Sequence, residues 1–150
     1  MAGTQYINLD IAASGDVNAY EGTASSLTLC VYQLRDRKAY DKLRDDDDAL
    51  DVLLACEKFD AAVVGRERLF FDPGEARTVV MERRRGANVL LVAAGYHRAA
   101  FADAVIAIDL PAVRVGLRKP RPPTFTLKLH CNNMVREKVR RGFLFFGSYQ

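Results

Sequence analysis

Alternation of apolar and polar side chains is the clearest pattern along the chain. In segment 6–11 the odd positions are aliphatic and the even positions mostly polar, which is typical of a strand with one buried face. Segment 125–129 repeats the alternation. Segment 27–34 is apolar on both faces as far as Gln33, so we predict that it lies centrally in a sheet covered on both sides.

A helical period replaces the alternation over 35–57. Tyr40 and several leucines fall at helix-compatible spacings there, interrupted by four aspartates at 45–48. We expect a short helix at 38–43 and a second helix starting near Asp48, because acidic residues favour the positive N-terminal end of a helix.

Short strands then follow one another. Asp72-Pro73-Gly74-Glu75 places Pro and Gly where a type II turn needs them, and 85–88 supplies another connection. Short strands with regular turn signals predict a mainly β protein, a sandwich or a barrel, with one helical insertion at about 37–57. The further predicted strands cover 59–64, 66–71, 77–82, 89–96, 105–108 and 112–117.

Size and composition predict one globular domain over residues 1–150. The chain has 150 residues, of which 49% are hydrophobic and 27% charged, and its net charge is +3. That length supports a core without metal or disulfide staples. Segment 118–150 opens with a proline-rich stretch that cannot be a central strand, and its very apolar run 143–146 is predicted as a closing strand or an adhesive patch.

No targeting signal is visible in the sequence. No stretch approaches the ~18 consecutive apolar residues of a membrane-spanning helix. Met1-Ala2-Gly3 leads directly into strand-like sequence without a secretory leader. We therefore expect either a cytosolic protein or a mature domain whose leader has been removed.

The sequence offers few residues for metal binding or for disulfide bonds. Cys30, Cys56 and Cys131 lack paired zinc-type spacing, and we interpret them as buried small apolar side chains, with at most one bridge among them. The adjacent carboxylates of 45–48 do not follow the alternate spacing of a calcium loop. We predict no metal and no cofactor.

Catalytic motifs are also missing from the sequence. His130 and Cys131 are neighbours on a predicted strand and point to opposite faces, so they do not form a catalytic pair. His97 beside Arg98 is the best candidate for acid–base chemistry, but a polar pair at a strand end is usually solvated. We therefore predict that the protein is not an enzyme and has no catalytic residues.

Basic clusters and a long loop support two kinds of binding module. The clusters at 83–85, 118–121 and 136–141 leave open a cytosolic β-module that binds nucleic acid or another anionic ligand. The small, polar loop 14–26 and the helical insertion instead favour a rigid β scaffold that presents loops to a partner.

Three motifs occur in an order that resembles a known family. A Val31-Tyr32-Gln33-Leu34 strand precedes the turn at 72–75, and the Ala94-Gly95-Tyr96 strand end follows it. This arrangement, over about Ile7 to Val113, resembles the TssJ (SciN/VasD-like) family of type VI secretion system lipoproteins.

The resemblance implies a transthyretin-like β-sandwich of two sheets with a short helical insertion. It also implies a structural lipoprotein at the periplasmic face of the outer membrane, with no nucleic acid and no small-molecule substrate. The family's partner is the periplasmic C-terminal domain of TssM, and its contact is the loop between the first two strands. Here that loop carries Asn18, Ala19, Tyr20, Glu21, Gly22 and Thr23, with Tyr20 as the best anchor.

The sequence departs from the family pattern in three places. The acylated cysteine of the family is absent, and we expect the N-terminal acyl anchor upstream of this sequence. The chain has no Trp, and Phe101 is expected to replace the tryptophan that follows the Gly-aromatic-Arg segment in many members. The loop is small and acidic and lacks the prolines often found there.

Overall fold

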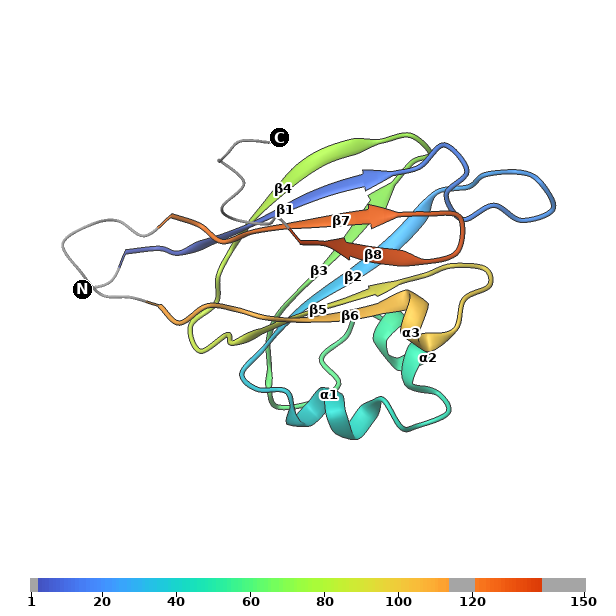
Figure 1. The fold of residues 1–150 in the computed structure, drawn as a ribbon. Helices are drawn as coiled ribbons and strands as arrows, with labels where there is room; N and C mark the ends of the chain where they lie inside the picture. The colour runs from blue at the N-terminus through green and yellow to red at the C-terminus, as the bar shows by residue number, and fades with distance from the viewer. Residues whose placement is uncertain (1–2, 114–120, 139–150) are drawn as a thin grey trace.

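Two four-stranded sheets pack face to face in the computed structural model, which describes residues 3–113 and 121–138 (Figure 1). The strand orders are β4-β1-β7-β8 and β3-β2-β5-β6, so the predicted β-sandwich is confirmed. The strands are β1 (Tyr6–Ala13), β2 (Leu27–Leu34), β3 (Val63–Phe71), β4 (Ala76–Glu82), β5 (Val89–Ala94), β6 (Val105–Asp109), β7 (Thr124–Leu129) and β8 (Met134–Glu137). The helices are α1 (Lys38–Leu43), α2 (Ala49–Leu54) and α3 (Phe101–Ala104).

The first sheet is built around β1 and β7, which run parallel to each other. The alternation predicted for β1 is confirmed, because Ile7, Leu9 and Ile11 are buried while the residues between them face outward. Leu127 and Leu129 of β7 enter the same core. Burial of these aliphatic side chains fixes the register of the two strands, since a slip by one residue would turn every one of them to the solvent.

The second sheet has β2 between β3 and β5, both antiparallel to it, as its two apolar faces predict. The expected pair of strands at 59–64 and 66–71 is wrong, because one continuous strand, β3, replaces it. Gly65 lies inside β3 and admits the side chain of Arg84, whose Cγ would lie 2.8 Å from an added Cβ. Phe59 lies before β3 and packs edge-on against Tyr32, with ring centroids 5.2 Å apart.

The helical insertion covers the outer face of the second sheet and is fixed to it covalently. Cys30 of β2 and Cys56 after α2 form a disulfide with Cα atoms 5.4 Å apart. The sequence allows at most one bridge among the three cysteines, and Cys30–Cys56 is that bridge, whereas Cys131 is a free thiol. Arg66 and Arg68 donate to the Cys56 and Ala55 carbonyls, which stabilises the negative C-terminal end of α2.

The β3–β4 turn forms as predicted, whereas several strand boundaries differ from the predictions. The type II turn at 72–75 is confirmed, since Gly74 has φ 77° and the Glu75 N–H donates to the Asp72 carbonyl. The short helix α3 and the edge strand β8 are absent from the predictions. Strand β5 ends at Ala94, and residues 111–113 form no strand, whereas 114–117 and 143–146 lie outside the described residues. No helix in the described part of the chain has the length and apolar character needed to cross a bilayer.

Candidate docking site

The β1–β2 loop, residues 14–26, projects beyond the end of both sheets (Figure 1). Its base is anchored by Val17, whose side chain is fully buried. The Ser25 N–H donates to the Val17 carbonyl over 3.2 Å, and the Ser14 N–H donates to the Leu129 carbonyl over 2.8 Å. The two ends of the loop are therefore held to each other and to the end of β7.

The tip of this loop is a two-residue hairpin. Tyr20 and Thr23 exchange both backbone hydrogen bonds, 2.9 Å and 3.1 Å long. The two residues between them have positive φ angles, 52° at Glu21 and 80° at Gly22. Positive φ at both central positions defines a type I′ turn, whose twist matches that of paired strands. The tip therefore has a defined backbone rather than an open loop.

Asn18 joins the tip to the body of the protein. Its backbone is left-handed, with φ 51°, a conformation that asparagine tolerates better than most residues. Its buried side-chain amide donates to the Ser26 carbonyl over 3.1 Å and accepts from the His97 N–H over 2.8 Å. Its own carbonyl accepts the Ser25 hydroxyl over 2.9 Å. A buried amide bonded in this way fixes two loops relative to each other.

The β5–α3 loop supports the ring of Tyr20. The imidazole of His97 lies with its centroid 5.3 Å from that ring, and the guanidinium carbon of Arg98 lies 5.6 Å from the same centroid. Both side chains are exposed, and Tyr20 itself is 44% exposed. At the base of this loop the Tyr96 hydroxyl donates to the Asn133 carbonyl over 2.9 Å. Burial, the largest cause, raises the pKa of Tyr96, which keeps the phenol neutral.

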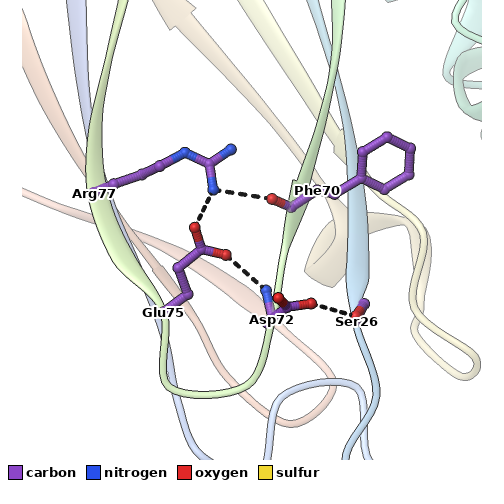
Figure 2. Close-up of polar contacts among 5 residues, drawn as sticks. All are labelled: Ser26, Phe70, Asp72, Glu75 and Arg77. Carbon is purple, nitrogen blue, oxygen red and sulfur yellow. Dashed lines mark hydrogen bonds and ion pairs between the residues drawn. The ribbon is translucent and has the colours of Figure 1, made fainter.

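The β3–β4 turn supports the other side of the loop base. The Ser26 hydroxyl donates to the Asp72 carboxylate over 2.6 Å, and Figure 2 shows this contact beside the turn. The Asp72 N–H donates to Glu75, whose carboxylate also pairs with Arg77, while Arg77 reaches the Phe70 carbonyl. The backbone hydrogen bond from Asp72, followed by the bond from Arg77, lowers the pKa of Glu75.

The structure places the six loop residues in different surroundings. Asn18 is buried and Ala19 half-buried, whereas Tyr20, Glu21, Gly22 and Thr23 are exposed on the hairpin tip. His97 and Arg98 join this surface although they lie far away in the sequence, and they were not predicted as part of it. No local pattern could have revealed them, because their place depends on the pairing of β5 with β2.

The other candidate sites, for a metal ion and for an anionic ligand, are not assembled in the described residues. Within residues 3–113 and 121–138, no group of three or more His, Cys, Asp or Glu residues is placed to hold a metal ion. Of the basic clusters, Arg83 is used inside the fold, donating to the Ala87 and Pro111 carbonyls. Arg136 lies over the ring of Phe125 with its guanidinium carbon 5.2 Å from the centroid. Residues 118–120 and 139–141 lie outside the described residues.

The described residues form a β-sandwich of two four-stranded sheets that presents a supported hairpin. Residues 5–133 match the family model T6SS-SciN, described as "Type VI secretion lipoprotein, VasD, EvfM, TssJ, VC_A0113". The chain therefore belongs to the type VI secretion lipoprotein family. Members of this family are structural subunits and not enzymes, which confirms the expectation drawn from the sequence.

Solved structures share the fold at low sequence identity. The lipoprotein TssJ1 from Pseudomonas aeruginosa aligns with a TM-score of 0.69 and 20% identity, over 92% of this chain and 100% of that one. The Serratia marcescens Lip protein, a membrane-bound component of the type VI secretion system, aligns with a TM-score of 0.73 and 16% identity, over 89% and 98%. A chain described as "T6SS protein TssM C-terminal domain (869-1107) from EAEC" aligns with 0.69 and 20%, over 90% and 99%. A search of curated protein sequences finds no match.

Proposed function

We propose that this chain is the outer-membrane lipoprotein subunit of a type VI secretion membrane complex and docks the periplasmic C-terminal domain of TssM. The contact is the hairpin tip of the β1–β2 loop. The observation that carries the proposal is the preformed turn with the exposed Tyr20 beside it. Tyrosine is frequent in binding hot spots, and a preordered loop loses little conformational entropy when it binds.

The six loop residues have two different roles in this proposal. Tyr20, Glu21, Gly22 and Thr23 face the solvent and make the contact, together with the half-buried Ala19. Asn18 holds the tip in place from below, because its amide is already used by Ser26 and His97.

The direction of β1 separates the tip from the site of membrane attachment. The chain enters β1 at Tyr6 and leaves it toward the projecting loop after Ala13. At about 3.4 Å per residue, those eight residues span roughly 25 Å. An acylated cysteine upstream of this sequence would hold the opposite end at the outer membrane, and two or more acyl chains give stable attachment. The tip then faces the periplasm.

The Cys30–Cys56 disulfide supports the same location. Disulfides persist in oxidising compartments such as the periplasm and are rare in the cytosol. This bridge fixes the helical insertion onto β2. It therefore favours a periplasmic protein over the cytosolic module that the basic clusters left open.

The experiment is a calorimetric titration of this chain with the periplasmic C-terminal domain of TssM. A tip variant replaces residues 19–23 with Gly and Ser but keeps Asn18, so that the loop base is preserved. The matched control is Arg85→Ser in the exposed β4–β5 turn, beside the start of β1 and therefore at the opposite end. We expect the tip variant to lose at least tenfold in affinity and the control to bind as the unmodified chain does. Absence of binding by the unmodified chain, or equal binding by the tip variant, contradicts the proposal.

A further inference from the structure

The guanidinium of Arg98 lies over the exposed ring of Tyr20 at the hairpin tip. Its carbon lies 5.6 Å from the Tyr20 centroid, and the side chain is exposed. It comes from the β5–α3 loop, which the His97 N–H fixes to Asn18 over 2.8 Å. Arg98 therefore occupies a defined place on the tip surface although its side chain is long.

The contact with Tyr20 leaves the N–H donors of Arg98 available for hydrogen bonds to a partner. A guanidinium carries five N–H donors, which lie in the plane of the group and point outward from it. The ion pairs of the described residues are Arg37–Asp109 and Arg77–Glu75, and Arg98 belongs to neither. Its planar fork of donors matches a carboxylate in a two-point geometry.

Charges near the tip restrict what a partner presents there. Glu21 follows Tyr20 on the turn and is exposed, and Asp16 at the loop base accepts the Ser14 hydroxyl over 2.6 Å. A partner carboxylate placed on the Glu21 side would meet a like charge, whereas one placed over Arg98 meets an opposite charge. The surface therefore favours an acidic side chain in a defined orientation.

We propose that Arg98 is a second recognition residue of this surface and pairs with an Asp or Glu carboxylate of the docked partner. An apolar part of the same partner segment packs on Tyr20. The proposal rests on the docking function proposed above and adds to it a residue from a second loop and the chemistry of the partner segment. The pair fixes the orientation of the partner as well as adding affinity, because a two-point bond is directional.

A purely structural role for Arg98 predicts a different outcome. If the side chain only supports the ring of Tyr20, an apolar side chain of similar length at this position preserves binding. If it pairs with a carboxylate, that replacement loses both the affinity and part of the salt dependence of binding, since ion pairing at a surface weakens with ionic strength.

The experiment measures the dissociation constant for the TssM periplasmic domain at several salt concentrations, for the unmodified chain, Arg98→Met and Arg98→Glu. Arg85→Met is the control, since it removes an exposed arginine outside this surface. We expect Arg98→Met to weaken binding about 10- to 100-fold at low salt, a loss typical of a charged hydrogen-bonded pair. It should also flatten the salt dependence, and Arg98→Glu should weaken binding further.

The outcomes separate this inference from the function on which it rests. If the unmodified chain binds and Arg98→Met keeps its affinity within twofold, the carboxylate pairing is wrong and the docking function stands. An affinity loss in Arg98→Met with an unchanged salt dependence also overturns the pairing, because it shows a supporting role only. If the unmodified chain does not bind, the docking function itself is wrong and the inference falls with it.

Discussion

The backbone N–H of His97 donates a 2.8 Å hydrogen bond to Asn18 Oδ1, which joins two loops 79 residues apart in sequence. Through this bond the projecting hairpin is attached to the β5–α3 loop as well as to β1 and β2, the strands that flank it. The same asparagine adopts a left-handed backbone and bonds Ser26. One buried side chain thereby positions the whole surface that we assign to docking.

Replacement of Asn18 separates the contribution of its backbone from that of its amide. We expect Asn18→Gly to lose the two side-chain hydrogen bonds while keeping the φ of 51° accessible. Asn18→Ala loses the bonds and adds backbone strain, so it should be the less stable variant by about 1 kcal/mol. Chemical denaturation measures the free energy of unfolding of both variants. Equal stability of the two variants would show that the left-handed backbone costs nothing here.

Substitutions in the hairpin turn test its type I′ geometry. Gly22→Ala places a Cβ on a residue with φ 80° and should destabilise the turn by roughly 1 kcal/mol. Glu21→Asn creates the Asn-Gly pair that this turn prefers and should stabilise it. Amide hydrogen exchange at Tyr20 and Thr23, whose N–H groups close the hairpin, measures both effects.

The control for this series lies in the same loop. Gly15 has no atom within 4 Å of an added Cβ and no positive φ, so Gly15→Ala should leave the exchange rates unchanged. Slower exchange in Gly22→Ala, or faster exchange in Glu21→Asn, would contradict the turn assignment.

Loss of the Cys30–Cys56 bridge should destabilise the protein and release the end of α2. The bridge closes a loop with a sequence separation of 26, which corresponds to roughly 3.5 kcal/mol in the chain-entropy model. Denaturation of Cys30→Ala/Cys56→Ala measures this loss, with Cys131→Ser as the control that keeps the bridge. Thiol titration of the denatured, unreduced chain should find one reactive thiol, and three would contradict the bridge.

The ionised carboxylate of Glu75 should stabilise the β3–β4 turn in a pH-dependent way. Hydrogen bonds from the Asp72 N–H and Arg77 lower its pKa below the ordinary value of a glutamate. A carboxylate with a lowered pKa contributes stability that is present above the pKa of the unfolded state and is lost as pH falls through the folded pKa. We therefore expect Glu75→Gln to lower Tm at pH 7 and the difference to shrink as pH falls through the acidic range in which Glu75 becomes protonated. Glu137→Gln, an exposed glutamate on β8, is the control. A difference independent of pH would contradict this account.

Much of the fold follows from local patterns in the sequence. The alternation in β1 and β7 marks their buried sides, and the Pro-Gly pair at 73–74 marks a turn whose glycine does adopt positive φ. Strand β8 could not be predicted in this way, because its Met-Val-Arg-Glu sequence offers one buried residue, Met134, and no alternation. The edge position of β8 explains the weak pattern, because β8 is held largely by its pairing with β7.

The docking surface depends on contacts that no local pattern contains. Loop length and the aromatic Tyr20 are visible in the sequence, but the burial of Asn18 depends on the approach of His97. The position of Arg98 over the ring of Tyr20 likewise depends on the end of β5 lying beside β2. Pairing of Cys30 with Cys56 depends on where α2 ends above the sheet, and spacing alone left that pairing open.

A photo-crosslinking amino acid at position 20 tests docking through the hairpin tip most directly. The ring of Tyr20 is 44% exposed at the tip, so a photoreactive phenylalanine fits there without burying new groups. The same label at Arg85, exposed in the β4–β5 turn, is the matched control. Irradiation with the TssM periplasmic domain should give a covalent adduct from position 20 and none from position 85. No adduct from position 20 under conditions where the two proteins bind, or equal adducts from both positions, would contradict the account.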